Sequence, residues 1–359
     1  MSGYAIVTGG GTAGHINPAI AIAKALQEDG YEVLYVGSDG EDCLDRELVE
    51  RSGLPFMGLK ITTPLLKASW QTVVSIVSIM KATRMCRRMM KKKRPSLVVG
   101  TGGFVSIPVL NAALSLKIKT AVHEQNVYPG ITNRRLSKKV DRVFMTFSES
   151  LKYLGCPEEK AVLSGIPLVR RPQARSLAEY AEGLQDGMRV LVSGGSLGSR
   201  RLNEVVIEAS AGLAKQETGI RIKLSCGKNY YERLKTTDIP NLEIVPYIFD
   251  MPAELNRADL MVCRAGSSTV FEGIVSELPA IVVPSPNVAG DHQRPNARYW
   301  QSLGAAIYVE EDELTGDTLA DMLLRLYRNK NELLKMKESA TKVDTPCAID
   351  VIIKELKKL

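Results

Sequence analysis

A short apolar run followed by a glycine-rich turn and a helical segment occurs three times in this chain. Residues 4–15 read YAIVTGGGTAGH, residues 97–103 read LVVGTGG and residues 190–199 read VLVSGGSLGS. After the first run, helical character is expected over residues 18–26. Unbroken apolar runs of this length are typical of strands that are buried on both faces of a parallel sheet. The turns at Gly9 and Gly194 lie 185 residues apart, so we predict one architecture that is used twice.

Further strand-like runs alternate with helical segments along the whole chain. They lie at residues 32–36, 120–122, 140–146, 221–225, 242–245, 260–263, 280–283 and 306–309. This alternation predicts an α/β protein with parallel sheets covered by helices on both faces. At 359 residues the chain can bury two cores, so we expect two Rossmann-like domains that face a central cleft. We place them at residues 1–165 and 166–342, and the last helix, residues 343–359, could pack back on the first domain.

Composition excludes several classes of protein. The chain is 45% hydrophobic and 24% charged, which is typical of a globular protein and not of a disordered or fibrous one. Its six cysteines form no CxxC pair and its three histidines are dispersed, so we predict no disulfide scaffold, no metal site and a reducing cytoplasmic environment. No secretory signal is evident at the N-terminus. The uncharged residues 95–116 are interrupted by proline and glycine, which favours strand, loop and helix over a membrane span.

The net charge of +7 is concentrated in the first half of the chain. Residues 1–165 carry a net charge of +8 and residues 166–359 carry −1. No acidic residue lies between Arg51 and His123, and a basic run at residues 81–94 follows an apolar segment at 65–80. Three interpretations remain open: a helix with a core face and a solvated basic end, a peripheral membrane contact, or a nucleic-acid surface. The last is disfavoured because few aromatic residues lie among the cations.

The glycine loops are candidate phosphate sites. Glycines at a strand-to-helix turn let backbone N–H groups approach an anion, and the helix N-terminus adds partial positive charge. The first loop formally matches the dinucleotide fingerprint at Gly9, Gly11 and Gly14. That fingerprint expects an acid at the end of the second strand, but here Asp39 lies two residues beyond Gly37. The alternative is that these glycines only form tight turns.

The second half carries a more specific cluster. Residues 259–272 read DLMVCRAGSSTVFE, which predicts a strand, a loop and the start of a helix. Thr269 and Glu272 have the spacing of a helix capping box, and they could equally bind a phosphate and a ribose. The following loop, residues 284–293 (PSPNVAGDHQ), has side chains that suit sugar hydroxyls.

Together and in this order, the motifs resemble the MurG family of peptidoglycan N-acetylglucosaminyltransferases, which have the GT-B fold. They are residues 9–15, 102–104 (GGF), 123–126 (HEQN), 194–196 (GGS), 263–272 and 291–293 (DHQ). The resemblance implies inverting transfer of N-acetylglucosamine from UDP-N-acetylglucosamine to the muramyl 4-hydroxyl of undecaprenyl-diphospho-muramoyl-pentapeptide (lipid I), giving lipid II. It also implies a role in cell-wall synthesis and hence in cell shape and division. We expect no cofactor and, since no Asp-x-Asp element is present, no obligatory metal.

The resemblance also implies roles for individual residues. Expected UDP contacts are Ile248 at the uracil, Glu272 at the ribose, and Ser196, Gly266, Ser267, Ser268 and Thr269 at the diphosphate. Expected sugar contacts are Gln293 with Thr12, Ala13, Gly14 and Asn126, and the acceptor diphosphate is expected near Gly14, Gly102 and Gly103. His15 is the first candidate for the general base and Glu124 the second, although His15 could instead only bind the acceptor.

Three positions depart from the family pattern. Leu197 replaces a usual glutamine, and Arg294-Pro295 follows the DHQ motif. The arginine of a family motif at residues 165–170 (GIPLVR) comes one place late, so the role of Arg170 as a diphosphate ligand stays open.

A lipid-linked acceptor favours the membrane interpretation of the basic segment. We expect Trp70, Val73, Val74, Val77, Arg84, Arg87 and Arg88 to contact anionic lipid on the cytoplasmic face of the bacterial membrane. We expect no nucleic-acid partner and leave open further partners among cell-wall synthesis proteins. Rival functions are another GT-B glycosyltransferase, a nucleotide-sugar sensor without turnover, and a nicotinamide-dependent oxidoreductase.

Overall fold

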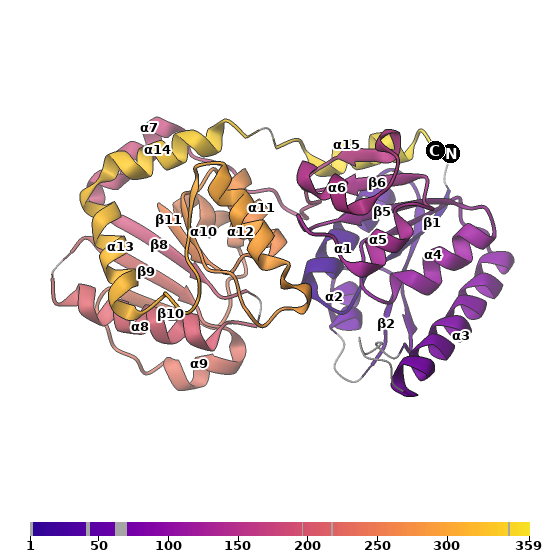
Figure 1. The fold of residues 1–359 in the computed structure, drawn as a ribbon, viewed down its shortest axis with the longest axis horizontal. Coiled ribbons are helices and arrows are strands. Elements are labelled where there is room, and N and C mark those ends of the chain that lie inside the picture. Colours follow the sequence, from indigo (N-terminus) through magenta and orange to yellow (C-terminus); the bar gives the residue numbers. More distant parts are fainter. Residues whose placement is uncertain (1–2, 41–43, 62–69, 196, 217, 344) are drawn as a thin grey trace. The chain divides into compact units, whose positions relative to one another are not determined.

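The chain forms two compact units (Figure 1), each described here by itself. The structure is a computed structural model that describes residues 3–40, 44–61, 70–195, 197–216, 218–343 and 345–359, without the side chains of residues 70–73 and 289. One unit comprises Met1–Val169 with Pro346–Leu359, and the other comprises Arg170–Thr345.

The first unit is built on a parallel sheet. Within the described residues this sheet has seven strands in the order β3-β2-β1-β4-β5-β6-β7. The strands are β1 (Tyr4–Thr8), β2 (Glu32–Ser38), β3 (Phe56–Leu59), β4 (Leu97–Gly100), β5 (Lys119–Glu124), β6 (Arg142–Met145) and β7 (Ala161–Leu163). The helices are α1 (Ala13–Glu28), α2 (Asp45–Arg51), α3 (Trp70–Lys92), α4 (Ser106–Ser115), α5 (Ile131–Leu136), α6 (Leu151–Leu154) and α15 (Ala348–Leu356), with 3₁₀ turns η1 (Ser148–Ser150) and η2 (Glu158–Lys160).

The second unit repeats this plan. Its described residues form a six-stranded parallel sheet in the order β10-β9-β8-β11-β12-β13. The strands are β8 (Met188–Ser193), β9 (Ile220–Ser225), β10 (Leu242–Val245), β11 (Leu260–Cys263), β12 (Ala280–Val282) and β13 (Ala306–Tyr308). The helices are α7 (Leu177–Gly183), α8 (Arg200–Ala214), α9 (Lys228–Leu234), α10 (Met251–Arg257), α11 (Ser267–Val275), α12 (Gln293–Ser302), α13 (Gly316–Arg328) and α14 (Lys330–Thr341), with 3₁₀ turns η3 (Leu184–Asp186) and η4 (Ala289–Asp291).

These two Rossmann-like sheets confirm the predicted fold class. In each, the strand order reverses between the first strand and the fourth, at β1/β4 and at β8/β11. Ligands of doubly wound sheets bind beyond the carboxyl ends of the strands at such a switch point. The register places the glycine loops there, because Thr8 pairs with Gly100 and Ser193 pairs with Cys263.

The apolar runs read from the sequence are the central strands. Alternate residues of β1 enter different cores: Ile6 packs with Val98 and Leu110, whereas Ala5 and Val7 join the cluster under α1. A strand that is covered on both faces needs no polar side, which explains why the sequence does not alternate. The same cluster contains Ala348, Ile352 and Leu356 of α15, so the C-terminal helix packs on α1.

Two local features differ from expectation. Strand β3 was not predicted, because its sequence FMGL is short and only Leu59 is fully buried. Helix α1 begins at Ala13 and contains Pro18, whereas we expected helical character only from Pro18 onward. Proline is compatible with helical φ, but without an N–H it cannot bond to the carbonyl of Gly14.

Helix α3 unites the apolar and the basic parts of the charged segment in one element of 23 residues. Its inward side includes Ser75, Ala82, Cys86 and Met90, which are buried. Among the residues that the structure describes, no helix is both long and apolar enough to cross a membrane.

Candidate active site

The two glycine loops of the first unit interlock. A Cβ at Gly103 would lie 2.3 Å from the carbonyl oxygen of Gly10, and a Cβ at Gly9 would lie 2.0 Å from the Thr101 Oγ1 atom. Gly103 also has a φ of +77°, a conformation that other residues rarely adopt. These positions therefore need glycine for packing, whatever they bind.

A buried carboxylate binds the first glycine loop through a backbone amide. Asp45, at the start of α2, accepts hydrogen bonds from the Gly11 amide (3.1 Å) and the Ser38 amide (2.6 Å). The Tyr35 hydroxyl donates to the Gly9 carbonyl at 2.8 Å. Burial raises the pKa of Asp45, and the backbone donors counteract part of that shift. The Gly11 amide is thus already bound to an internal anion, a role for Asp45 that sequence reasoning missed.

His15 lies in the first turn of α1 beside the second loop. Its half-buried ring places the Nδ1 atom 3.0 Å from the Gln125 Oε1 atom. Its backbone carbonyl accepts a hydrogen bond from the Thr101 hydroxyl at 2.7 Å. A Cβ at Gly102 would lie 3.0 Å from the imidazole, so Gly102 leaves room for the ring. The structure therefore brings together His15, Gly102 and Gly103, three of the candidate site residues.

Gln125 and His123 continue this contact into the core. The Gln125 Nε2 atom donates to the carbonyl of Thr101 at 2.9 Å and lies 3.1 Å from His123 Nδ1. The His123 Nε2 atom lies 2.8 Å from the carbonyl oxygen of Gly165. Full burial lowers the pKa of His123 to about 4, so its ring is neutral at neutral pH.

The Glu124 carboxylate accepts hydrogen bonds from the residues that follow it in the chain. Its carboxylate accepts hydrogen bonds from the amide of Asn126 (2.9 Å), the side chain of Asn133 (2.9 Å) and the amide of Gly130 (3.2 Å). The residue is 1% exposed, and burial raises its pKa while these donors oppose the shift. This geometry suits a residue that shapes the turn carrying Asn126 better than one that takes a proton from a substrate.

The N-terminus of α11 forms the corresponding loop of the second unit. The helix begins at Ser267 with Gly266 as its N-cap, so Thr269 is the third helical residue and no Thr269–Glu272 capping box forms. The first amides of a helix have no intrahelical acceptor, and here they belong to Ser267, Ser268 and Thr269. The arrangement suits an anion.

Glu272 has the clearest electrostatic signature of the second unit. No hydrogen bond to its carboxylate is found among the described residues, and desolvation raises its pKa to about 7. A buried polar group without partners is costly unless a ligand supplies them. Two vicinal hydroxyls, such as those of a ribose, would donate the missing hydrogen bonds.

A buried arginine ties together the loops around this site. Arg264, which is 6% exposed, donates to the Ser199 hydroxyl (2.6 Å) and to the carbonyl of Val283 (3.3 Å), and it forms an ion pair with Glu311. Its partners follow strands β8, β12 and β13, and Arg264 itself follows β11. The sequence motif contained this arginine, but its bracing role was not predicted.

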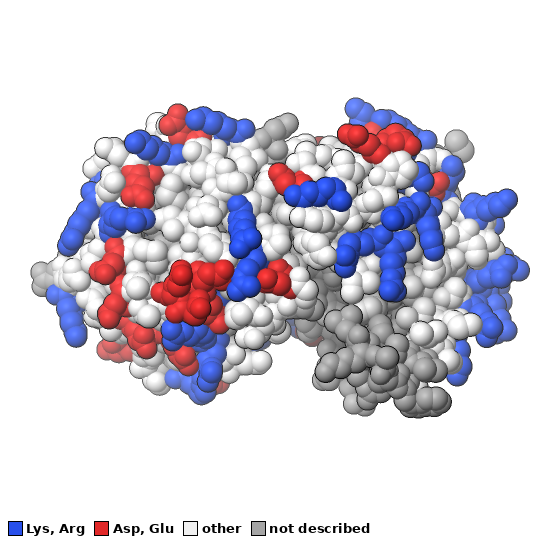
Figure 2. Space-filling model, in the orientation of Figure 1, with Lys and Arg blue, Asp and Glu red and all other residues white. Residues whose placement is uncertain are grey.

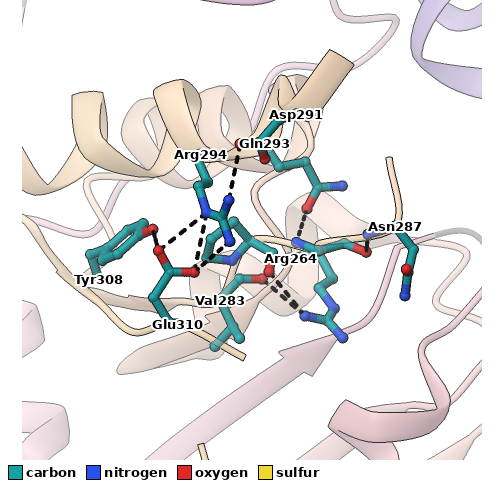
Figure 3. Close-up of polar contacts among 10 residues, drawn as sticks. Arg264, Val283, Asn287, Asp291, Gln293, Arg294, Tyr308 and Glu310 are labelled. Carbon is teal, nitrogen blue, oxygen red and sulfur yellow. Dashed lines mark hydrogen bonds and ion pairs between the residues drawn. The ribbon is translucent and has the colours of Figure 1, made fainter. Parts of the chain in front are cut away.

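The proline-rich loop, residues 284–293, is also fixed by side-chain hydrogen bonds and ion pairs. The Ser285 amide donates to the Gln293 Oε1 atom at 2.8 Å, and Arg294 binds both oxygens of Glu310 and one of Asp291 (Figure 3). Asp291 has a φ of +48°. Arg294, a departure from the family pattern, therefore acts within the protein, where it fixes the start of α12.

The other expected UDP contacts are placed as follows. Ile248 is 6% exposed, and its neighbour Phe249 is 87% exposed. Arg170 is exposed and forms a 2.9 Å ion pair with Asp250, the N-cap of α10. Ser196 lies outside the described residues, in which no cluster of three or more potential metal ligands occurs.

Helix α3 presents an apolar and basic outer surface. Val74 and Val77 are 41% and 44% exposed, and Arg84, Arg87 and Arg88 are exposed as well. Figure 2 shows lysine and arginine side chains gathered along the edge that α3 occupies, without acidic side chains among them. The side chains of Trp70 and Val73 are not among those described.

Comparisons with known proteins agree along the whole chain. Residues 5–145 match the glycosyltransferase family 28 N-terminal domain, and residues 189–351 match the glycosyltransferase family 28 C-terminal domain. A protein of Bacillus licheniformis is 36% identical over 366 residues, which cover 99% of this chain and 98% of that protein. A protein of Lactococcus lactis subsp. cremoris is 37% identical over 352 residues, which cover 96% of each. Both are named UDP-N-acetylglucosamine--N-acetylmuramyl-(pentapeptide) pyrophosphoryl-undecaprenol N-acetylglucosamine transferase.

Among solved structures, Acinetobacter baumannii MurG superposes with a TM-score of 0.80 at 28% identity, covering 99% of this chain and 100% of that one. The order of the motifs, the two Rossmann-like sheets and both halves of the family model agree. This chain belongs to glycosyltransferase family 28.

Proposed function

We propose that this chain transfers N-acetylglucosamine from UDP-N-acetylglucosamine to the 4-hydroxyl of the muramyl residue of lipid I, with inversion, and so forms lipid II. One observation carries the proposal: relatives with this activity in their names are 35–37% identical over nearly the whole chain. Roles in peptidoglycan synthesis, cell shape and cell division follow from the reaction.

The transfer is a single displacement with His15 as the general base. The acceptor oxygen attacks the anomeric carbon, its proton passes to His15, and UDP leaves with the electrons of the broken bond. His15 is favoured over Glu124 because it is partly accessible, whereas the Glu124 carboxylate is buried against four donors of its own turn.

The donor binds at the carboxyl edge of the second sheet. The first turn of α11, with Gly266, Ser267, Ser268 and Thr269, binds the diphosphate through amides and hydroxyls, and Ser196 adds to this set. Glu272 accepts hydrogen bonds from the ribose, the backbone of Ile248 binds the uracil and Gln293 binds the sugar. The developing charge on UDP is stabilised by these donors. We assign Arg170 no direct diphosphate contact, since it pairs with Asp250.

The acceptor binds at the loops of the first unit. Gly14, Gly102 and Gly103 allow close approach of the lipid diphosphate, while Thr12, Ala13 and Asn126 are the sugar contacts of this unit. The Gly11 amide is excluded from this set because Asp45 already binds it.

The reaction is tested with purified protein, labelled UDP-N-acetylglucosamine and a short-chain lipid I analogue, with and without EDTA. We expect labelled disaccharide and UDP in both samples. His15→Ala should reduce the turnover by about 10²–10⁴-fold, the typical contribution of a general base, and should leave UDP binding unchanged. Product only without EDTA would remove the metal-free mechanism, and no product would point to another acceptor or to a sensor.

We also propose that α3 anchors the first unit at the inner leaflet of the membrane. Exposed valines and arginines on one helix suit insertion beside anionic lipid. Replacing Arg84, Arg87 and Arg88 by glutamate should abolish binding to anionic liposomes and preserve UDP binding. Undiminished liposome sedimentation of the triple variant would contradict this anchor.

A further inference from the structure

The orientation of the Gln125 amide is fixed by its surroundings. Its nitrogen faces two backbone carbonyls, those of Thr101 at 2.9 Å and His123 at 3.1 Å. Carbonyl oxygens only accept hydrogen bonds, so a flipped amide would place oxygen against oxygen. The Gln125 oxygen must therefore face His15, whose Nδ1 atom lies 3.0 Å away. An amide oxygen also only accepts, and this contact requires a proton on Nδ1.

His123 supports the same assignment from the other side. Its Nε2 atom faces the carbonyl of Gly165 and must carry the proton of the neutral ring. Its Nδ1 atom is then a lone-pair acceptor, and it receives a hydrogen bond from the Gln125 nitrogen at 3.1 Å. Because His123 and Gln125 are almost completely buried, water does not compete for these contacts. One pattern of protons is consistent with every contact from Gly165 to His15, with the two N–H groups of Gln125 shared among three acceptors.

We infer that Gln125, held by His123, is a positioning residue that keeps neutral His15 in the Nδ1–H tautomer and so presents Nε2 as the proton acceptor. This inference rests on the proposed function, in which His15 is the base. A neutral imidazole in water favours the Nε2–H tautomer, in which the outer nitrogen cannot take a proton. The row of hydrogen bonds reverses that preference, as the partner of a ligating or catalytic histidine commonly does.

The amide also keeps a neutral oxygen opposite Nδ1. When Nε2 takes the acceptor proton, Nδ1–H stays bonded to a neutral oxygen, whereas a carboxylate there would favour the charged ring. The described groups that face His15 include the neutral Gln125 amide, the neutral His123 ring and the Gly102 backbone. Asp45 binds the Gly11 amide of the same loop.

The tautomer can be measured on the unaltered protein by ¹⁵N NMR with labelled histidine. The chain has only three histidines, and His15→Ala assigns the resonance in question. Above pH 8 we expect His15 to be protonated on Nδ1 and His123 on Nε2, with coupling patterns that distinguish the two. Finding His15 protonated on Nε2 would overturn the inference without reference to activity.

Variants then connect the tautomer to turnover. Gln125→Leu should lower kcat by about 10–10²-fold, part of what a general base contributes, with little change in the KM for UDP-N-acetylglucosamine. Gln27→Leu, the same change at an exposed site on α1, is the control. In Gln125→Leu the ¹⁵N pattern of His15 should shift toward the Nε2–H tautomer, a change that a purely structural role of Gln125 does not predict.

The outcomes separate this inference from the proposed function. Full kcat in Gln125→Leu, or an unchanged Nδ1–H tautomer of His15 in that variant, would overturn the positioning role. Full activity in His15→Ala would instead overturn the choice of His15 as base. The NMR experiment would still decide independently which nitrogen of His15 carries the proton.

Discussion

Removing the negative charge of Glu272 should stabilise the second unit while weakening its binding of UDP. Desolvation raises the pKa of this carboxyl from 4.5 to about 7. A group whose pKa is raised on folding stabilises the protein fully only below the unfolded pKa, and that stability is lost as the pH rises through 7. Each unit of pKa is worth about 1.4 kcal/mol, so the ionised carboxyl costs up to about 3.4 kcal/mol above pH 8. Some solvent reaches the side chain, which makes this value a ceiling.

The variant Glu272→Gln removes this cost because its side chain does not ionise. Between pH 5 and pH 8.5 its advantage in unfolding free energy over the parent should grow by about 2.5 kcal/mol. For a unit of this size that is a rise of about 5–10 °C in the melting temperature. Scanning calorimetry at both pH values measures it, and the transition that UDP shifts identifies the second unit.

The control is Glu182→Gln, an exposed carboxyl on α7 of the same unit. It should change the melting temperature little at either pH. UDP should bind Glu272→Gln about 10–10²-fold more weakly, the usual worth of hydrogen bonds to a charged acceptor. For the parent, affinity should fall as the pH drops below 7, because protonation competes with ribose binding. A difference in melting temperature that is the same at both pH values would refute the reasoning.

Three further predictions concern Arg264, Gly102 and His123. Arg264→Lys keeps the charge but loses the planar fork that joins Ser199 to Glu311. UDP affinity should therefore fall, and the free energy of unfolding should fall by about 1–3 kcal/mol; titration and calorimetry measure them. Gly102→Ala, at a φ of +107° and against the His15 ring, should cost about 1–3 kcal/mol and reduce kcat, whereas Gly130→Ala, with open space and ordinary φ, should do neither. The pKa of His123 is lowered to about 4, so its neutral ring stabilises the first unit fully above pH 6.5. In chemical denaturation the free energy of unfolding should decline as the pH falls toward 4, and it should decline less in His123→Asn.

The central strands of the fold were predictable because each is visible in the sequence as a short apolar run. The runs that became β1, β8 and β11 are mainly apolar because helices cover both faces of each sheet. Edge strand β3 has no such requirement, and a glycine at its third position further weakens the signal. The start of α1 was misplaced because a proline is usually found in the first turn of a helix, whereas Pro18 is the sixth residue of α1.

The site was predictable only in part, for a related reason. Glycine, serine and histidine at a strand-to-helix turn are visible as local motifs. Their partners are distant: Asp45 lies 34 residues from Gly11, Glu311 lies 47 from Arg264, and Gln125 lies 110 from His15. Sequence spacing carries no information on such pairs until the register of the sheet is known.

The Asp45 contact also separates the first loop of this chain from dinucleotide-binding loops with the same glycine spacing. In a dinucleotide site the loop amides and the helix N-terminus bind a pyrophosphate. Here a carboxylate of the protein takes the Gly11 amide, and the Ser38 amide at the end of β2 binds the same group. The end of β2, where the acid for a ribose is expected, is therefore joined to the loop itself. A second anion at Gly11 would be repelled by the Asp45 carboxylate, so the fingerprint here describes the shape of a turn. Any anion bound by this loop would have to contact residues from Thr12 onward.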